Sequence, residues 1–316
     1  MSAPLIETRG LLKYFATPKG ALHAVDNVNL KIERGHVLGV VGESGCGKST
    51  LGRTILRLTE PTGGDILYDG ESYLKYSDKQ MNEMRKKMQI IFQDPYSSLN
   101  PRMTIGDIIA EPLRVCKSCS KIEIDEKVLD IMNIVGLAER WVNSYPHELD
   151  GGRRQRVGIA RALVLEPSFI VCDEPVSALD VSIQAQILNL MMDLQRDMGL
   201  TYMFITHDLS VVKHISDQIM VMYLGQCVES AAPDELFKHP MHPYTVALLN
   251  AIPRPDLLHR DRERKIIKGE VSNPINPKPG CRFASRCPNA SEKCLQQDPP
   301  LKEIAPGHMV ACTLCE

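Results

Sequence analysis

The chain has 316 residues, of which 43% are hydrophobic and 24% charged, and its formal net charge at pH 7 is −2. It is long enough for one large domain or two unequal domains. The near-neutral net charge does not favour nucleic-acid binding. No apolar run is long enough to predict a membrane span. The N-terminal sequence MSAPLIETRG lacks the charged and then apolar pattern of a signal peptide, so we expect a cytosolic protein.

Strand-like and helix-like segments alternate along the first part of the chain. We expect strands at residues 6–8, 24–32, 36–41, 65–68, 88–92, 169–173, 201–206 and 218–223. We expect helices at residues 49–58, 123–135, 152–164 and 182–197, the last with apolar residues near helical spacing. This alternation favours an α/β fold with a mostly parallel sheet and helical layers. A helical block at about 100–165 interrupts it and predicts a separate lobe.

Residues 42–50 read GESGCGKST and match the phosphate-binding loop pattern G-x-x-x-x-G-K-[ST]. The glycines let the backbone turn so that successive N–H groups point at the phosphates, and the following helix adds its positive end. We expect Lys48 to contact the β- and γ-phosphates and Ser49 to bind Mg²⁺. The other loop residues expected to contact the nucleotide are Gly42, Ser44, Gly45, Cys46, Gly47 and Thr50.

A second nucleotide element follows at residues 169–174, an apolar strand, FIVC, that ends in two carboxylates. Asp173 is suited to hold the hydration shell of Mg²⁺, and Glu174 is then placed to polarise an attacking water. A buried strand with a polar end is common and indicates little alone. Together with the phosphate loop it predicts an ATPase.

The segment between these elements carries further motifs in a fixed order. Residues 147–156, HELDGGRRQR, resemble the signature motif of ATP-binding-cassette (ABC) proteins. Gln93 in IIFQDP matches the Q-loop of that family, and Asp180 in SALD matches its D-loop. His207 in FITHD matches its switch histidine. The chain is therefore identified as a member of the ABC family.

The resemblance implies a two-lobed nucleotide-binding domain at residues 1–235. It would contain a RecA-like mixed sheet, an N-terminal β subdomain and a helical subdomain at about 95–165. A C-terminal extension would occupy residues 236–316. Two such domains dimerise head to tail, and each ATP lies between the phosphate loop of one chain and the signature helix of the other.

The family also implies roles for individual residues. Glu174, His207 and Gln93 would be catalytic, and Mg²⁺ would be held through Ser49, Gln93 and Asp173. The adenine would stack on an aromatic side chain, for which Phe15 is the candidate and Tyr14 the alternative. The residues expected to contact ATP at the dimer interface are Asp150, Gly151, Gly152 and Asp180.

The signature departs from the family pattern, because LDGGR replaces the usual LSGGQ. The usual serine donates a hydrogen bond to the γ-phosphate, whereas an ionised Asp150 has no proton to donate and repels that phosphate. One reading is a tolerated variant in which Arg153 or a water compensates. The other reading is an asymmetric heterodimer, in which the site that uses Asp150 hydrolyses ATP poorly.

Residues 90–112 and 240–253 resemble the ATPase subunits of dipeptide, oligopeptide and nickel importers. That group implies an ATP-driven importer of di- or oligopeptides with two different ATPases, two permeases and a solute-binding protein. It implies a peripheral location on the cytoplasmic face of a bacterial or archaeal membrane. Residues 96–103 would receive the permease, unless they form a plain polar loop.

Five of the ten cysteines lie near the C-terminus, at Cys281, Cys287, Cys294, Cys312 and Cys315. In a cytosolic chain, clustered thiols favour a metal over disulfides. The family implies a [4Fe–4S] cluster on the first four, with Cys315 either as a spare or in place of Cys312. Structural zinc is the alternative, although only the last two cysteines have the close spacing that zinc sites favour. Free thiols are the third possibility.

Two other classes of function compete with a transporter motor. One is a soluble cassette ATPase acting on nucleic acid or ribosomes, against which the single cassette and the absence of a basic stripe argue. We therefore expect no nucleic-acid partner. The other is an ATP-binding assembly scaffold, against which the intact Lys48, Glu174 and His207 argue.

Overall fold

The computed structural model describes residues 3–117, 119–252 and 274–315, and it divides into two compact units. The first unit is formed by residues 1–32, 37–74 and 206–316, and the second by residues 33–36 and 75–205. Residue 253, which ends one of the importer-like segments, lies outside the described residues. The predicted division after residue 235 stays a prediction.

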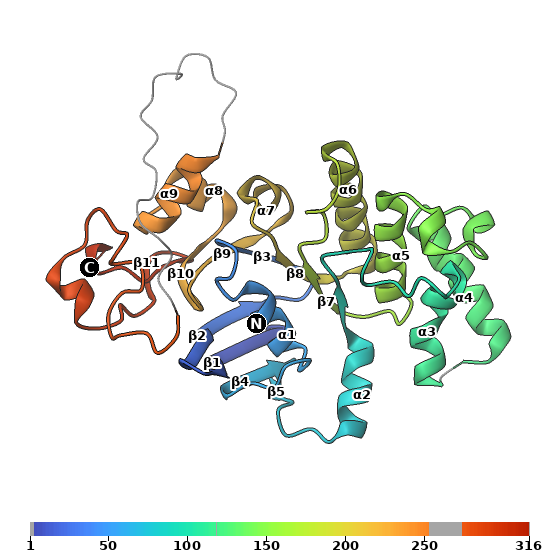
Figure 1. The fold of residues 1–316 in the computed structure, drawn as a ribbon, viewed down its shortest axis with the longest axis horizontal. Coiled ribbons are helices and arrows are strands. Elements are labelled where there is room, and N and C mark those ends of the chain that lie inside the picture. The colour runs from blue at the N-terminus through green and yellow to red at the C-terminus, as the bar shows by residue number, and fades with distance from the viewer. Residues whose placement is uncertain (1–2, 118, 253–273, 316) are drawn as a thin grey trace, which may run out of the picture. The chain divides into compact units, whose positions relative to one another are not determined.

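The first unit contains a four-stranded antiparallel sheet in the order β2-β1-β4-β5 (Figure 1). Its strands are β1 (Ile6–Thr17), β2 (Gly20–Ile32), β4 (Gly63–Tyr68) and β5 (Glu71–Ser72). β1 and β2 form a long hairpin, and their register shifts between Thr8 and Tyr14. Both strands extend well beyond the predicted segments. The prediction was too short because the outer parts of the hairpin are half-buried or exposed and lack a clear apolar alternation.

A second sheet of the first unit has the order β11-β12-β10-β9-β3. β3 (Val37–Val41) and β9 (Gln218–Tyr223) are parallel, whereas β10 (Gln226–Ala231), β12 (His308–Val310) and β11 (Lys302–Ala305) are added antiparallel. Every residue of β3 is buried, which explains its continuous apolar sequence. The C-terminal segment thus extends this sheet through β12.

The helices of the first unit are α1 (Lys48–Ile55), α7 (Leu209–Ile215), α8 (Pro233–Lys238) and α9 (Pro243–Ala251). α7 packs against β3, and α8 packs against β9 and β10. The tail also contains two short 3-10 helices, η4 (Glu292–Leu295) and η5 (Thr313–Cys315). Phe283 of the tail is buried against Tyr223 and Tyr244, with ring centroids 5.3 and 5.4 Å away. An aromatic core therefore joins the tail to β9 and α9.

The second unit contains three parallel strands in the order β8-β7-β6. They are β6 (Met88–Ile91), β7 (Phe169–Asp173) and β8 (Thr201–Ile205), and every residue of β7 and β8 is buried. Parallel strands need crossover connections, which the helices of this unit supply. The strands follow the predicted segments closely because apolar runs of this length are typical of buried parallel strands.

The helices of the second unit are α2 (Asp78–Lys87), α3 (Ile105–Cys116), α4 (Lys121–Ile134), α5 (Gly151–Leu163) and α6 (Val181–Met198). Two 3-10 turns, η1 (Glu139–Trp141) and η2 (Pro146–Glu148), lie before α5. α3, α4 and α5 pack on one another and form the predicted helical block. Across the described parts of the chain, no helix combines the length and hydrophobicity needed to cross a membrane.

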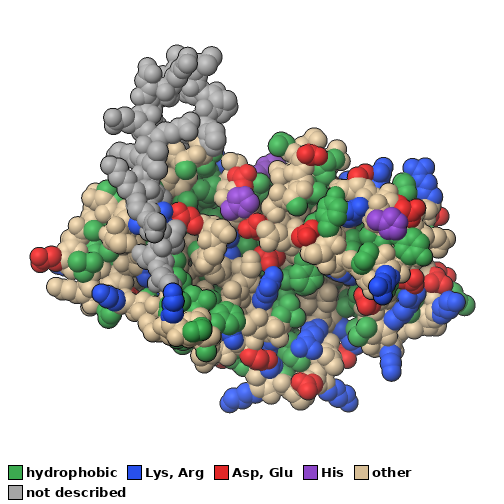
Figure 2. Space-filling model, viewed as in Figure 1, with side chains coloured by type: hydrophobic (Ala, Val, Ile, Leu, Met, Phe, Trp, Pro, Cys, Tyr) green, Lys and Arg blue, Asp and Glu red, His purple; other side chains and the backbone are tan. Residues whose placement is uncertain are grey.

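The surface carries charges of both signs. On the face shown in Figure 2, Lys and Arg side chains are interspersed with Asp and Glu side chains, as the net charge of −2 suggests.

Candidate functional site

The phosphate loop lies in the first unit, between β3 and α1, and three of its glycines have positive φ values. Gly42, Gly45 and Gly47 have φ values of 154°, 78° and 103°. A Cβ at Gly42 would lie 2.2 Å from the carbonyl oxygen of Met222, and a Cβ at Gly47 would lie 2.0 Å from that of Ala24. The loop can therefore hold this shape only with glycine at these two positions.

Lys48 is 4% exposed, and its ammonium group is satisfied by the loop itself. Its Nζ donates to the carbonyl oxygens of Gly42 at 2.8 Å and Glu43 at 3.0 Å. Cys46 is also buried, and burial raises the pKa of its thiol. Ser44 and Gly45 are exposed at the tip, so the loop presents backbone to solvent around a buried cation. This is the arrangement expected of an anion-binding loop.

His207 belongs to the first unit and is held near the strand that leads into the loop. The N–H of the preceding Thr206 donates to the carbonyl oxygen of Val40 at 3.1 Å. The following Asp208 caps α7 by accepting from the N–H of Ser210 at 2.7 Å. His207 is exposed between these two fixed neighbours.

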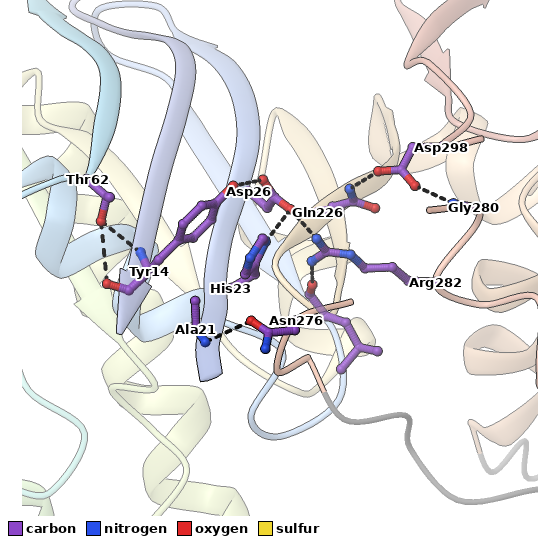
Figure 3. Close-up of polar contacts among 11 residues, drawn as sticks. Tyr14, Ala21, His23, Asp26, Thr62, Gln226, Asn276, Gly280, Arg282 and Asp298 are labelled. Atoms are coloured by element: carbon purple, nitrogen blue, oxygen red, sulfur yellow. Dashed lines mark hydrogen bonds and ion pairs between the residues drawn. The ribbon is translucent and has the colours of Figure 1, made fainter. Parts of the chain in front are cut away.

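The two candidates for adenine stacking differ in their surroundings. Tyr14 stacks on His23, with ring centroids 3.7 Å apart, and its hydroxyl donates to Oδ1 of Asp26 at 2.6 Å (Figure 3). Burial, followed by the contact with Asp26, raises the pKa of Tyr14 to about 12. Phe15 is 38% exposed, and the Nζ of Lys13 lies 4.8 Å from its ring centroid. Exposure favours Phe15 as the stacking residue, which remains a prediction.

The second unit brings two predicted catalytic residues together. Glu174 follows the buried Asp173, which ends β7. The backbone of Glu174 has φ 48°, a left-handed conformation that is unusual for a residue other than glycine. Its N–H donates to the carbonyl oxygen of Ile205 at 2.9 Å, and its Oε2 accepts from Nε2 of Gln93 at 3.0 Å. Such strained backbone often occurs at functional sites, where the surrounding structure maintains it.

The signature departure has a clear structural role. Asp150 is the N-cap of α5, where its Oδ1 accepts from the N–H of Arg153 at 2.8 Å. Its Oδ2 is paired with the guanidinium of Arg153 at 2.6 Å. Gly151 and Gly152 leave room for neighbours, since a Cβ at Gly152 would lie 2.7 Å from Cγ2 of Ile183. The charge of Asp150 is thus compensated within the motif.

Asp180 stands at the N-cap position of α6 without a side-chain capping bond, and it is exposed. The next residue, Val181, is also exposed. This end of α6 is accessible in the single chain. A role for Asp180 at a dimer interface stays a prediction.

The segment after Gln93 is ordered by specific contacts. Oδ1 of Asp94 accepts from the N–H of Tyr96 at 2.7 Å. The ring of Tyr96 is 60% exposed and lies under the guanidinium of Arg154, 4.0 Å from its centroid. Both interpretations of residues 96–103, a permease surface and a plain polar loop, are compatible with this exposed aromatic beside an arginine. Its use as a permease surface stays a prediction.

The predicted iron–sulfur centre is wrong, and so is its zinc alternative. Among the residues that the structure describes, no group of three or more His, Cys, Asp or Glu could hold a metal ion. The tail cysteines form no disulfide among the described residues. The Sγ of Cys294 lies 3.2 Å from Oγ1 of Thr313 and 3.4 Å from Oγ of Ser291. Burial raises the pKa of both Cys281 and Cys315 to about 11, whereas the hydrogen bonds with Ser291 and Thr313 lower the pKa of Cys294.

Side-chain contacts, and not the expected metal, attach the C-terminal tail to the rest of the first unit. His308 of β12 forms an ion pair with Glu229 of β10 at 2.8 Å, and neither side chain is exposed. Arg286 reaches Glu43 in the phosphate loop, and Arg282 reaches Asp26. Sequence reasoning missed these three contacts with the cassette. No local pattern marks them, because 243 residues separate Arg286 from Glu43.

Comparisons with known proteins identify the family of the chain. The family model "ABC transporter" matches residues 25–177, and the model "Oligopeptide/dipeptide transporter, C-terminal region" matches residues 228–294. A putative peptide import ATP-binding protein of Brucella ovis is 51% identical over 98% of this chain and 97% of its own length. The dipeptide transport ATP-binding protein DppF of Escherichia coli is 49% identical over 99% of this chain and 95% of its own length.

A solved structure gives the same result for the fold. The ATP-binding cassette MJ0796, in a dimeric post-hydrolysis state bound to ADP and Pi, superimposes with a TM-score of 0.66 at 30% identity. The match covers 72% of this chain and 98% of that protein.

Proposed function

This chain belongs to the ATP-binding subunits of the dipeptide and oligopeptide group of ABC transporters, and we propose that it drives the import of di- or oligopeptides by hydrolysing ATP. The family resemblance, the cassette fold and the ATPase class predicted from sequence are confirmed by relatives of about half identity and by the solved cassette. The observation that carries the proposal is that these relatives match nearly the whole chain and that the C-terminal model matches residues 228–294.

We assign triphosphate binding to the phosphate loop and hydrolysis to Glu174. The loop would receive the β- and γ-phosphates on its backbone N–H groups and on the ammonium of Lys48. Glu174 would take a proton from the attacking water as its oxygen bonds to the γ-phosphorus and the bond to the β,γ-bridging oxygen breaks. The hydrogen bond from Gln93 to Oε2 of Glu174 supports this assignment, because it fixes the carboxylate. His207 is assigned to the γ-phosphate by its family motif.

The predicted Mg²⁺ ligands fit the chemistry of that ion. Ser49, Gln93 and Asp173 offer hydroxyl, amide and carboxylate oxygens, and Mg²⁺ prefers oxygen ligands. When bound, Mg²⁺ neutralises charge on the phosphates. Phe15 is assigned to the adenine because it is the exposed aromatic of β1.

We further propose that the chain pairs with a different ATPase subunit. The pair formed by Asp150 and Arg153 is locally neutral, but its carboxylate still has no proton to donate to a γ-phosphate. The site that uses this signature would therefore turn over slowly. The site with Glu174 and His207 would be completed by a serine signature from the partner. Two permeases would bind near Tyr96, and the complex would lie on the cytoplasmic face of the membrane.

Replacing Asp150 with Ser is expected to raise turnover at the slow site by about tenfold. This factor corresponds to the free energy of about one hydrogen bond to a charged group. The helix should survive, because serine is also a favoured N-cap residue. The measurement is the residual ATPase rate of the reconstituted complex in a Glu174→Gln background, which silences this chain's own site. Asp193→Ser is the matched control, since Asp193 forms a similar pair with Arg196 on α6. An unchanged rate would mean that Arg153 already compensates and would contradict asymmetry.

Isolation of the chain from its native membrane in mild detergent tests the proposed partners. We expect two permeases, a second cassette with a serine signature and a solute-binding protein to copurify. Copurification with ribosomes or DNA-repair proteins would favour a soluble cassette instead. Recovery of the chain with permeases but without ATPase activity would favour the scaffold.

A further inference from the structure

The tail contacts the phosphate loop through a bidentate ion pair between Arg286 and Glu43. Nη1 of Arg286 lies 2.8 Å from Oε2 of Glu43, and Nη2 lies 3.0 Å from Oε1. Nη1 also donates to the hydroxyl of Tyr223 at 3.3 Å. The side chains of Arg286 and Glu43 are 7% and 27% exposed. Such a fork fixes both the position and the orientation of the carboxylate.

Glu43 is constrained at its backbone as well as at its side chain. Its N–H donates to the hydroxyl of Tyr244 on α9 at 2.9 Å. Its carbonyl oxygen accepts from Nζ of Lys48 at 3.0 Å. Arg286 therefore acts on the residue that also holds the phosphate-binding lysine.

A second arginine of the same tail segment, Arg282, contacts residues that adjoin the loop. Arg282 donates to Oδ2 of Asp26 and to the carbonyl oxygen of Leu224 (Figure 3). Asp26 also accepts from the hydroxyl of Tyr14, the neighbour of Phe15. The N–H of Gly225, next to Leu224, donates to the carbonyl oxygen of Cys46 in the loop at 2.8 Å.

From these contacts we infer that tail residues 281–287 position the phosphate loop for nucleotide, with Arg286 as the main positioning residue. The inference rests on the proposed function, because it concerns the same nucleotide site. Without Arg286, the loop loses its side-chain anchor, and an unpaired carboxylate remains beside the place where the phosphates bind. Both effects weaken ATP binding.

Calorimetric titration of the full chain with Mg²⁺ and ATPγS tests the inference. We expect Arg286→Ala to raise the dissociation constant about tenfold. Adding Glu43→Gln to that variant should recover at least half of the loss on a logarithmic scale, because it removes the unpaired charge. In the assembled ATPase, Arg286→Ala should raise KM for ATP more than it lowers kcat. Arg196→Ala, which removes an exposed ion-pairing arginine on α6, is the control and should change neither value.

Three outcomes would overturn the inference. They are a change of less than twofold for Arg286→Ala, an equal loss with and without Glu43→Gln, and a fall in kcat at constant KM. If Arg286→Ala does not fold, Arg286→Lys decides instead. Lysine keeps the charge but cannot form the bidentate contact, so we expect the dissociation constant to rise about threefold. An unchanged dissociation constant would overturn the inference. Failure of the unaltered chain to bind nucleotide would contradict the proposed function itself.

Discussion

A Glu174→Gln variant is expected to hydrolyse ATP about 10³-fold more slowly at its own site while still binding ATP. Glutamine has nearly the same shape, and its amide oxygen can accept the hydrogen bond that Nε2 of Gln93 now donates to Oε2. It cannot take a proton from water at neutral pH. The measurement is phosphate release in a single turnover, together with the amount of ATP that stays bound.

Glu166→Gln provides a matched control for this variant. Glu166 also has a left-handed backbone, with φ 54°, and its carboxylate is paired with Lys127 at 2.7 Å. It carries no predicted catalytic role, so its replacement should leave the rate unchanged. Retention of more than a tenth of the single-turnover rate by Glu174→Gln would show that another group activates the water.

Replacing His308 with Ala is expected to lower the free energy of unfolding by about 3–5 kcal/mol. Glu229 is fully buried and accepts from Nε2 of His308 at 2.8 Å and from the N–H groups of Met241 and His242. Removing His308 leaves a buried carboxylate without this side-chain hydrogen-bond partner. Urea unfolding of the isolated chain, followed by circular dichroism, measures the loss.

His239→Ala is the control for this comparison. His239 also pairs with a glutamate, Glu235, at 3.1 Å, but its side chain is largely exposed. Exposed pairs contribute about 0–1 kcal/mol, so this variant should unfold close to the parent chain. Equal losses for the two variants would mean that the pair between β12 and β10 does not secure the tail.

The sequence predicted best where the chemistry is local. The turn at residues 42–50 needs glycine and lysine at fixed spacing, and the structure places a buried Lys48 beside glycines with positive φ. The strands β6, β7 and β8 were recognisable because buried parallel strands are short continuous apolar runs. The hairpin of β1 and β2 was underestimated, since tertiary pairing rather than an apolar pattern extends it beyond the predicted residues.

Contacts over long sequence separations were not predictable in the same way. Clustering, spacing and the family resemblance suggested a metal for the tail cysteines, but none of these reports whether the thiols converge, are buried or are hydrogen-bonded to hydroxyls. The tail instead relies on the buried Glu229 and His308 pair and on arginines whose partners lie in the first 43 residues. No sequence motif identifies these partners, because the pairing depends on tertiary structure and not on local spacing.

Reconstitution of the purified complex in liposomes tests the central claim most directly. The complex would contain this chain, its partner ATPase, both permeases and the solute-binding protein. ATP supplied on the side of the ATPases should drive accumulation of a labelled di- or oligopeptide, and peptide-loaded binding protein should raise the ATPase rate. Glu174→Gln should abolish both. ATP hydrolysis that proceeds without any peptide uptake, or uptake that survives Glu174→Gln, would contradict the proposal that this chain is the motor of a peptide importer.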